Sequence, residues 1–295
     1  MARVLIIGSG GRLGGALREI YSTRHEVVGL DRKALDFSDL KNVRETIDAQ
    51  PGFDVAINCA ALTNVDYCET HPDEAFAVNA EAVRVAAESV WKRGAQLIHI
   101  STDYVFDGAK AGSYAETDEV APISIYGESK RAGEIALLDV SPDHLAARVS
   151  WVFGPHRPSF IDMMLKRAVT DEKVAAIADK DSTPSYTFDL AAMIEPFFTG
   201  VRAGGILHLC NSGFCTWRDY AQYALDVAHE TGLALKATHV DPIPLKSLKA
   251  FVARRPRNTV MSTARLTALT GQTPRSWQEA VREYVTTYGG RIVAG

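Results

Sequence analysis

The sequence has no long hydrophobic run. Its most apolar stretches are as short as Val4-Leu5-Ile6-Ile7, whereas a membrane-spanning helix needs roughly 20 apolar residues. The quartet leads directly into glycines, without the apolar region and the small-residue cleavage site of a secretory signal. We therefore expect a cytoplasmic protein that does not associate with membranes.

Cysteine is scarce, and basic residues form no dense cluster. The cysteines include no CxxC pair and no spacing to histidine that is typical of a metal site; they are Cys59, Cys68, Cys210 and Cys215. We interpret them as buried, reduced thiols and predict no metal site. The 32 basic and 36 acidic residues give a net charge of −4, so nucleic acid is not an expected partner.

The first 150 residues alternate short apolar runs with longer helical patterns, which is typical of repeated βα units over a parallel sheet. Strands are expected at 3–8, 27–30, 55–58, 96–101 and 145–149, and helices at 12–22, after a cap at Ser38, and at 124–138. A further long, alanine-rich segment covers 72–93. The pattern predicts an α/β fold with a Rossmann-type, doubly wound parallel sheet.

After residue 150 this alternation stops, and eight of the twelve prolines follow from Pro155 onward. A helix near Ser159 is expected, and a helix at 189–198 with a strand at 205–209 is expected to return to the main sheet. We therefore predict a dinucleotide-binding domain at 1–150 and 186–211. A smaller, discontinuous C-terminal substrate domain is predicted at 151–185 and 212–295.

The glycine-rich segment Gly8-Ser9-Gly10-Gly11-Arg12-Leu13-Gly14 lies where the first strand becomes the first helix. Glycines at this place permit a tight turn, close approach of the backbone to a pyrophosphate, and close helix-on-strand packing. The helix start offers free N–H groups to the phosphates. We predict a dinucleotide site in which the contacts come from Gly8, Gly11, Arg12, Leu13 and Gly14.

Two residues after the second strand bear on the choice of cofactor. Asp31 is placed to accept hydrogen bonds from both ribose hydroxyls of NAD. Its neighbour Arg32 is suited to the extra phosphate of NADP, or is a solvated surface charge. The residues leave the cofactor as either NADPH or NADH.

Tyr126 and Lys130 are four residues apart in a helical pattern, so they share one helix face. An ammonium near a phenol favours the phenolate and brings its pKa toward the range of a general acid. Chance also produces such pairs. Thr102 adds a hydroxyl at the carboxyl edge of the sheet, where open α/β sheets bind ligands.

The glycine turn, Thr102 and the Tyr126–Lys130 pair, in this order, resemble the extended short-chain dehydrogenase/reductases, and more closely their dTDP-4-dehydrorhamnose reductase branch. The similar segments cover nearly the whole chain: Ala60-Ala61-Leu62-Thr63-Asn64-Val65-Asp66, Ser101-Thr102-Asp103-Tyr104-Val105-Phe106-Asp107-Gly108, Tyr126-Gly127-Glu128-Ser129-Lys130, Arg148-Val149-Ser150-Trp151-Val152-Phe153-Gly154, Ser185-Tyr186-Thr187-Phe188-Asp189-Leu190-Ala191, Thr216-Trp217, Arg255-Pro256-Arg257-Asn258 and the stretch around Trp277.

The resemblance implies a reductase that converts the 4-keto group of a nucleotide-linked 6-deoxy sugar to a hydroxyl, with hydride from NADPH or NADH. It implies that Tyr126 protonates the developing alkoxide, that Lys130 lowers the tyrosine pKa and binds the nicotinamide ribose, and that Thr102 orients the carbonyl. It adds cofactor contacts at Asp36, Phe37, Ala60, Ala61 and Thr63, besides Asp31, Arg32, Tyr126 and Lys130. It places substrate contacts at Val65, Asp66, Thr102, Asp103, Tyr104, Trp151, Arg255 and Arg257, with Thr63 also near the sugar.

Departures from the family pattern bear on the activity, the pocket and the dimer that the resemblance implies. Tyr104 stands where related 4,6-dehydratases have a glutamate, which disfavours dehydration. The turn at 182–185 differs from the usual one, and Gly15-Ala16 offers no carboxylate for a metal-bridged dimer. A monomer or a homodimer is expected. Two alternatives stay open: a reductase of another nucleotide 4-ketosugar, and a non-catalytic subunit like the regulatory subunit of methionine adenosyltransferase.

Overall fold

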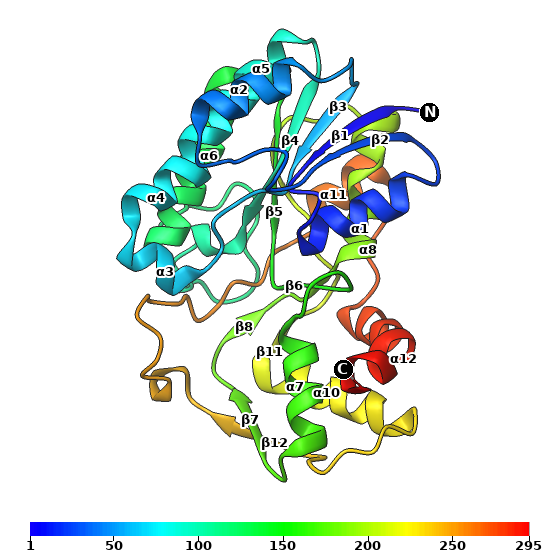
Figure 1. Ribbon diagram of the computed structural model, residues 1–295. Helices are drawn as coiled ribbons and strands as arrows, with labels where there is room; N and C mark the ends of the chain where they lie inside the picture. Colours follow the sequence, from blue (N-terminus) through cyan, green and yellow to red (C-terminus); the bar gives the residue numbers. More distant parts are fainter. Residues whose placement is uncertain (295) are drawn as a thin grey trace.

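The computed structural model describes residues 1–294. Its centre is a six-stranded parallel sheet in the order β10-β5-β4-β3-β1-β2 (Figure 1). The strands are β1 (Arg3–Ile7), β2 (Glu26–Leu30), β3 (Val55–Asn58), β4 (Gln96–Thr102), β5 (Leu145–Val149) and β10 (Gly205–His208). Every residue of β3 and β5 is buried, as expected of parallel strands covered on both faces. The predicted doubly wound sheet is confirmed.

Successive side chains along each strand pack alternately against two separate layers of helices, one on each face of the sheet. Leu5 and Ile7 pack in the core under α2 (Leu40–Asp48), α5 (Ala82–Lys92) and α6 (Ile125–Val140). Val4 and Ile6 pack in the core under α1 (Arg12–Tyr21), α8 (Thr187–Ile194) and α11 (Ala264–Thr270). Figure 1 shows these two layers on opposite sides of the sheet.

Three sequence expectations change in detail. Ser38 does not cap α2, because the side chain of Asp39 accepts the N–H groups of Lys41 and Asn42 while the Ser38 hydroxyl donates to Asp36. The segment at 72–93 is divided into α4 (Pro72–Phe76), a π-helical turn (Ala77–Glu81) and α5. The helix expected at 189–198 begins earlier, and Pro196 separates α8 from α9 (Pro196–Thr199).

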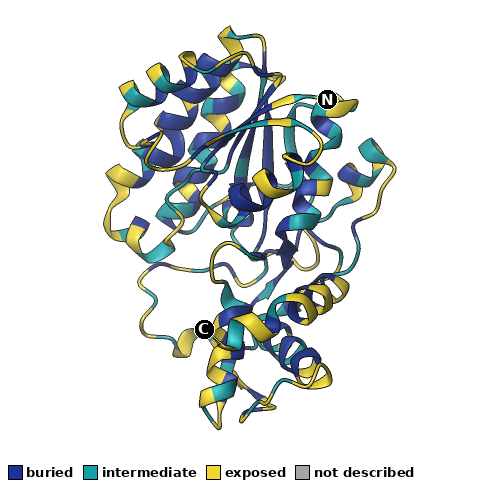
Figure 2. Cartoon of the chain, turned by 45° about the vertical axis from the view of Figure 1, so that its right-hand side comes forward, coloured by how far each residue is buried: buried dark blue, intermediate teal, exposed yellow. Residues whose placement is uncertain are grey.

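A second, smaller core lies beyond the carboxyl edge of the sheet (Figure 2). It is built by α7 (Phe160–Thr170), α10 (Trp217–Glu230) and α12 (Trp277–Ala294). Short pairs of strands flank it: β6 (Val152–Phe153) with β9 (Ser185–Tyr186), β7 (Val174–Ile177) with β12 (Val240–Ile243), and β8 (Asp181–Ser182) with β11 (Cys215–Thr216). The remaining elements are α3 (Val65–Thr70) and the 3₁₀ turns Asp103–Val105 and Leu245–Ser247.

The chain returns from this second core to the main sheet, as expected. Strand β10 pairs with β5, and α8 packs on α1. Leu266 of α11 also lies in the sheet core, although its position falls in the range predicted for the second domain. The division into two domains stays a prediction. Within residues 1–294, no helix is long and apolar enough to cross a membrane.

Buried charge fastens α6 to the sheet. Glu134 of α6 is fully buried and accepts two hydrogen bonds of 2.8 Å from Arg148 of β5, which is 1% exposed. The Ser101 hydroxyl of β4 and the Arg131 guanidinium also donate to this carboxylate, at 2.7 and 3.0 Å. Burial alone would raise the pKa of Glu134, but these donors lower it, so the carboxylate is charged.

Replacing Arg148 with leucine removes the main partner of a buried carboxylate. We expect Arg148→Leu to lower the free energy of unfolding by about 3–5 kcal/mol, because it leaves an uncompensated charge inside the protein. The control is Arg84→Leu, which removes an exposed helix pair with Glu88 at 3.3 Å and costs about 0–1 kcal/mol. Urea unfolding of both variants measures the difference. Equal losses would contradict the structural role given to Glu134.

Candidate active site

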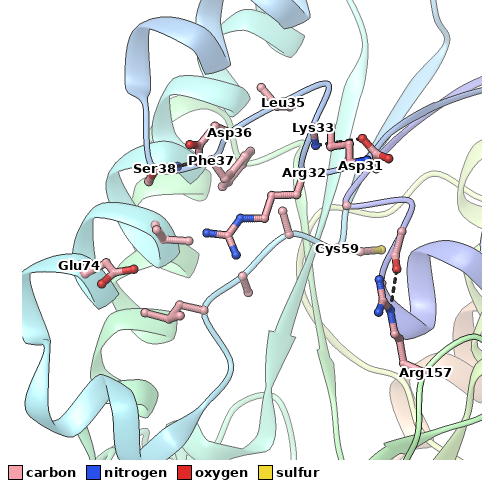
Figure 3. Close-up of a pocket in the computed structure, with 17 residues that line it drawn as sticks. Asp31, Arg32, Lys33, Leu35, Asp36, Phe37, Ser38, Cys59, Glu74 and Arg157 are labelled. Carbon is pink, nitrogen blue, oxygen red and sulfur yellow. Dashed lines mark hydrogen bonds between the residues drawn. The ribbon is translucent and has the colours of Figure 1, made fainter.

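A cleft of about 440 Å³ opens at the carboxyl ends of β1 and β3 (Figure 3). From β1 the chain runs to β2 on one side of it and then crosses to β3 on the other side, so the strand order reverses here. This is the topological switch point at which open α/β sheets bind ligands. The residues that line the cleft are Gly8, Gly10, Gly11, Asp31, Arg32, Lys33, Leu35, Asp36, Phe37, Ser38, Cys59, Ala60, Ala61, Leu62, Glu74, Val78 and Arg157.

The glycine turn of this cleft has no room for side chains at two positions. Gly8 has a φ of +79°, and a Cβ there would lie 2.7 Å from the backbone nitrogen of Ala60. A Cβ on Gly14 would lie 2.3 Å from the carbonyl oxygen of Gly8. The two glycines therefore let β1, β3 and α1 approach each other at backbone distance, which is what this turn requires.

The start of α1 has properties that suit a pyrophosphate. Its cap residue Gly11 offers no side-chain hydrogen bond, and its first turn contains no acidic residue. By contrast, α2 and α6 are capped by the side chains of Asp39 and Ser124. Because the first N–H groups of α1 have no side-chain partner, they are available to an anion. The residues present thus fit a dinucleotide.

The cleft is lined by three carboxylates, those of Asp31, Asp36 and Glu74, and by two guanidinium groups. Asp31 Oδ1 accepts the backbone N–H groups of Lys33 and Ala34, at 3.0 and 3.1 Å. Figure 3 shows the Arg32 guanidinium extending into the cleft. Arg157 also lines it and donates from Nε to the carbonyl of Gly10, at 3.1 Å. Sequence reasoning missed Arg157, because it comes from a distant proline-flanked segment.

The structure gathers most of the predicted cofactor residues in this cleft. Those that line it are Gly8, Gly11, Asp31, Arg32, Asp36, Phe37, Ala60 and Ala61. Others lie outside the lining. Arg12 donates to the carbonyls of Val152, Arg157 and Pro158, while Leu13 is buried in the sheet core. Thr63 is exposed after β3. Cofactor contacts by these residues stay predictions.

The predicted catalytic residues come from β4 and α6. Thr102 ends β4, and its hydroxyl donates to Asp103 Oδ1 at 3.1 Å. Ser150 donates to the other oxygen of Asp103, at 2.8 Å, so this carboxylate holds the threonine in place. Tyr126 lies in the first turn of α6. Burial raises its pKa, and a hydrogen bond with Thr102 opposes the rise.

Lys130 follows Tyr126 by one helical turn and is 1% exposed. Its Nζ lies 2.7 Å from the carbonyl oxygen of Ile100 and 3.0 Å from Nε2 of His99. Burial lowers the pKa of Lys130 to about 8, against the opposing effects of Glu134 and Cys59. The lysine is therefore anchored to β4, and its effect on the pKa of Tyr126 stays a prediction.

Tyr104 lies beside Tyr126, with ring centroids 5.7 Å apart in an edge-on arrangement. Lys180 places Nζ 5.2 Å from the Tyr104 ring centroid and donates to the carbonyl of Pro256. Burial raises the pKa of Tyr104 and lowers that of Lys180 to about 8. Lys180 carries no sequence signal, since its position is decided by folding of the chain after β7.

Several predicted substrate residues contact one another. Asp66 of α3 forms an ion pair with Arg255, with an Nη2–Oδ2 distance of 2.6 Å. The Arg255 guanidinium lies 3.5 Å from the Phe251 ring centroid. Hydrogen bonding by Arg255 lowers the pKa of Asp66 to about 2. The pair joins segment 244–258, orange in Figure 1, to the sheet side of the molecule.

The other substrate candidates differ in setting. Trp151 has a φ of +44°, a strained value for a tryptophan, at the end of β5. Its ring stacks on Trp217 with centroids 5.2 Å apart. Val65 begins α3. Arg257 is exposed and lies 3.8 Å from Asp179. Contacts of these residues with a substrate stay predictions.

Comparison with known proteins identifies the family. The family described as RmlD substrate binding domain matches residues 2–289. The chain belongs to this family. Spore coat polysaccharide biosynthesis protein SpsK of Bacillus subtilis (strain 168) is 36% identical over 289 residues, covering 97% of each chain. A dTDP-4-dehydrorhamnose reductase of Aggregatibacter actinomycetemcomitans is 34% identical over 290 residues, covering 96% of this chain and 98% of that protein.

Solved structures agree with this membership. The dTDP-4-dehydrorhamnose reductase of Bacillus anthracis str. Ames, in complex with NADP, superposes with a TM-score of 0.90 and 30% identity. That match covers 97% of this chain and 99% of the other. A UDP-glucose 4-epimerase of Thermus thermophilus has a TM-score of 0.80 at 22% identity, covers 98% of this chain and 99% of the other, and shares the fold alone.

The contact between Gly14 and Gly8 provides a test of the cleft. We expect Gly14→Ala to weaken NADPH binding at least tenfold, because relieving such a contact costs about 1–3 kcal/mol and moves the start of α1. Gly290→Ala is the control, since a Cβ there meets nothing within 4 Å. Calorimetric titration with NADPH measures both. Unchanged affinity in Gly14→Ala would mean that this turn does not bind the cofactor.

Proposed function

We propose that this protein is a reductase that converts dTDP-4-dehydrorhamnose to dTDP-L-rhamnose with hydride from NADPH or NADH. The observation that carries the proposal is the placement of Thr102, Tyr126 and Lys130 at the carboxyl edge of a sheet whose switch-point cleft fits a dinucleotide. The relatives named dTDP-4-dehydrorhamnose reductase, one of them solved with NADP, support the substrate and the cofactor.

In this proposal Gly8, Gly11, Asp31 and the first turn of α1 hold the dinucleotide, which supplies the hydride when bound. Tyr126 then donates its phenolic proton to the oxygen that becomes the 4-hydroxyl. Burial keeps Tyr126 protonated near neutral pH, as a proton donor must be. The Thr102 hydroxyl has a single proton, which it donates to Asp103 in the structure. In this proposal it turns that proton to the carbonyl oxygen of the bound sugar and so orients the carbonyl.

The surroundings favour reduction over dehydration of the sugar. Elimination of a 6-hydroxyl needs a base next to the catalytic threonine, and Tyr104 occupies that region. Burial raises the pKa of Tyr104, so this phenol does not ionise in the neutral range. The residue that follows Thr102 is Asp103, and its carboxylate is already hydrogen-bonded to Thr102 and Ser150. The local chemistry therefore suits one proton donation to a carbonyl oxygen.

We further infer that residues 1–150 and 186–211 bind the cofactor, and that 151–185 and 212–295 bind the nucleotide sugar. Separate cores around the sheet and around α7, α10 and α12 support this division. Asp66 and Arg255, which form an ion pair, and Trp151, which packs against the second core, are the substrate contacts we propose first. A cytoplasmic protein that is a monomer or a homodimer, without nucleic-acid partners, remains our prediction.

The central test replaces the proton donor. With dTDP-4-dehydrorhamnose and NADPH, we expect Tyr126→Phe to lower kcat by roughly 10²–10⁴-fold, because a positioned general acid contributes that much. Cofactor affinity is expected to stay within about twofold. Tyr223→Phe on α10 is the matched control. The decrease in NADPH absorbance follows the reaction, and near-wild-type turnover in Tyr126→Phe would refute the mechanism.

Asp31 is expected to favour NADH and Arg32 to favour NADPH, and measuring the cofactor preference tests these two expectations. If Arg32 binds the 2′-phosphate of NADP, Arg32→Ala lowers kcat/KM for NADPH by roughly ten- to hundredfold and changes the value for NADH little. The control is Arg202→Ala, an exposed arginine outside the cleft. An unchanged ratio of kcat/KM for NADPH to that for NADH would identify Arg32 as a solvated charge. Asp31 would then be the residue that binds the ribose.

A further inference from the structure

The segment that follows β6 lies against the glycine turn and brings a guanidinium group to the cofactor cleft. Arg157 is exposed, lines the cleft, and donates from Nε to the carbonyl of Gly10 at 3.1 Å. Its two Nη groups form no hydrogen bond with residues 1–294. Figure 3 shows this guanidinium beside the turn, on the other side of the cleft from Asp36 and Glu74. Arg157 thus reaches the cleft from the part of the chain assigned above to the nucleotide sugar.

Within residues 1–294, the guanidinium of Arg157 has no carboxylate partner. The carboxylates that line the cleft are those of Asp31, Asp36 and Glu74, and each accepts hydrogen bonds from other groups. A cation in the wall of a cleft that is not neutralised by the protein attracts an anionic ligand. The planar fork of a guanidinium suits the oxygens of a phosphate group.

Arg12 fastens the same segment from the opposite direction. Its Nε donates to the carbonyl of Arg157 and its Nη1 to that of Val152, both at 3.2 Å, and its Nη2 donates to the carbonyl of Pro158. Arg12 of α1 therefore binds the backbone of the segment after β6, while Arg157 of that segment binds the backbone of the glycine turn. Because Arg12 uses its donors on protein carbonyls, Arg157 is the arginine whose Nη groups are available to a ligand.

A second contact holds the segment on α1. Nε2 of His156 lies 2.8 Å from Oε2 of Glu19. A Cβ on Gly15 would lie 2.8 Å from Cγ of His156, so the imidazole packs directly on the helix backbone. His156 has a φ of +76°, which is uncommon outside glycine and which these contacts maintain. The backbone that carries Arg157 is thus placed before a ligand binds, which reduces the entropy lost on binding.

We infer that Arg157 binds a phosphate group of the dinucleotide, so that a residue of the segment after β6 completes the cofactor site. This inference rests on the proposed function, which places a dinucleotide in the cleft. Gly10, to which Arg157 donates, immediately precedes the cap residue of α1. The pyrophosphate is expected at this helix start, so it is the phosphate group that we assign to Arg157. The cofactor then contacts both parts of the chain.

Binding of the cofactor can be measured without turnover. Calorimetric titration of the full chain with NADPH, NADH and ADP-ribose compares three ligands that share the pyrophosphate, of which NADPH alone carries the 2′-phosphate. We expect Arg157→Gln to weaken the binding of all three by roughly tenfold, because it removes charge-assisted hydrogen bonds to phosphate. Arg157→Lys is expected to lose less affinity, since it keeps the charge and lacks only the planar fork.

The matched control is Arg202→Gln, which removes the same charge from an exposed arginine outside the cleft. Because Arg157 is exposed too, the Tm of ligand-free Arg157→Gln is expected to stay within about 2 °C of wild type. Wild-type affinity of Arg157→Gln for all three ligands would overturn the inference and leave the proposed reductase intact. A loss confined to NADPH would support a phosphate contact and assign it to the 2′-phosphate.

Failure of the proposed function gives a different result. If the wild-type chain binds none of the three ligands, the cleft is not a dinucleotide site, and the proposed function and this inference are both wrong. If the wild-type chain binds them and does not reduce dTDP-4-dehydrorhamnose, the proposed substrate is wrong. A weaker affinity of Arg157→Gln for ADP-ribose would still support the contact in that case.

Discussion

The active site depends on how α6 is fastened to the sheet. The face of this helix that meets β4 and β5 carries Lys130 and Glu134, and both are buried. Lys130 donates to the carbonyl of Ile100, and Glu134 accepts hydrogen bonds from Ser101 and Arg148. Two glycines let α6 approach its other neighbours. A Cβ on Gly127 would lie 2.3 Å from the carbonyl oxygen of Tyr104, in the turn after β4, and one on Gly133 would lie 2.1 Å from that of Asn79, in the π-helical turn. Apolar packing tolerates sliding, whereas hydrogen bonds of fixed direction define one position of the helix. Tyr126 lies in the first turn of this helix, so the same contacts fix its position.

The same constraint also fixes the surroundings of the predicted catalytic residues, which come from different elements. Thr102 is held by Asp103 at the end of β4, and Lys130 is anchored to the same strand through Ile100. Tyr126 lies one turn before Lys130 on α6. Beyond the sheet edge lie the strained Trp151, which packs against the second core, and the ion pair of Arg255 with Asp66. A sugar bound there would meet groups whose positions are set before it arrives.

Much of the fold could be predicted because its signals are local. Continuous apolar runs marked buried parallel strands, and the glycines after β1 marked a turn that no other residue can form. Local signals also misled at the start of α2, where both Ser38 and Asp39 are good caps and only the folded loop decides that Ser38 binds Asp36. The division of the segment 72–93 by a π-helical turn likewise has no signature in its alanine-rich sequence.

The sequence by itself determined which residues can do the chemistry: a glycine turn for a dinucleotide, and a threonine, a tyrosine and a lysine in an order typical of one reductase family. It did not determine what each side chain contacts. The tertiary structure decided that Arg12 binds the carbonyls of a distant loop and that Arg157 lines the cleft. It also decided that Lys180 lies over the ring of Tyr104 and that Lys130 contacts His99. The reason is physical: spacing along the chain reports one helix or strand, whereas burial and hydrogen-bond direction arise only where several elements meet.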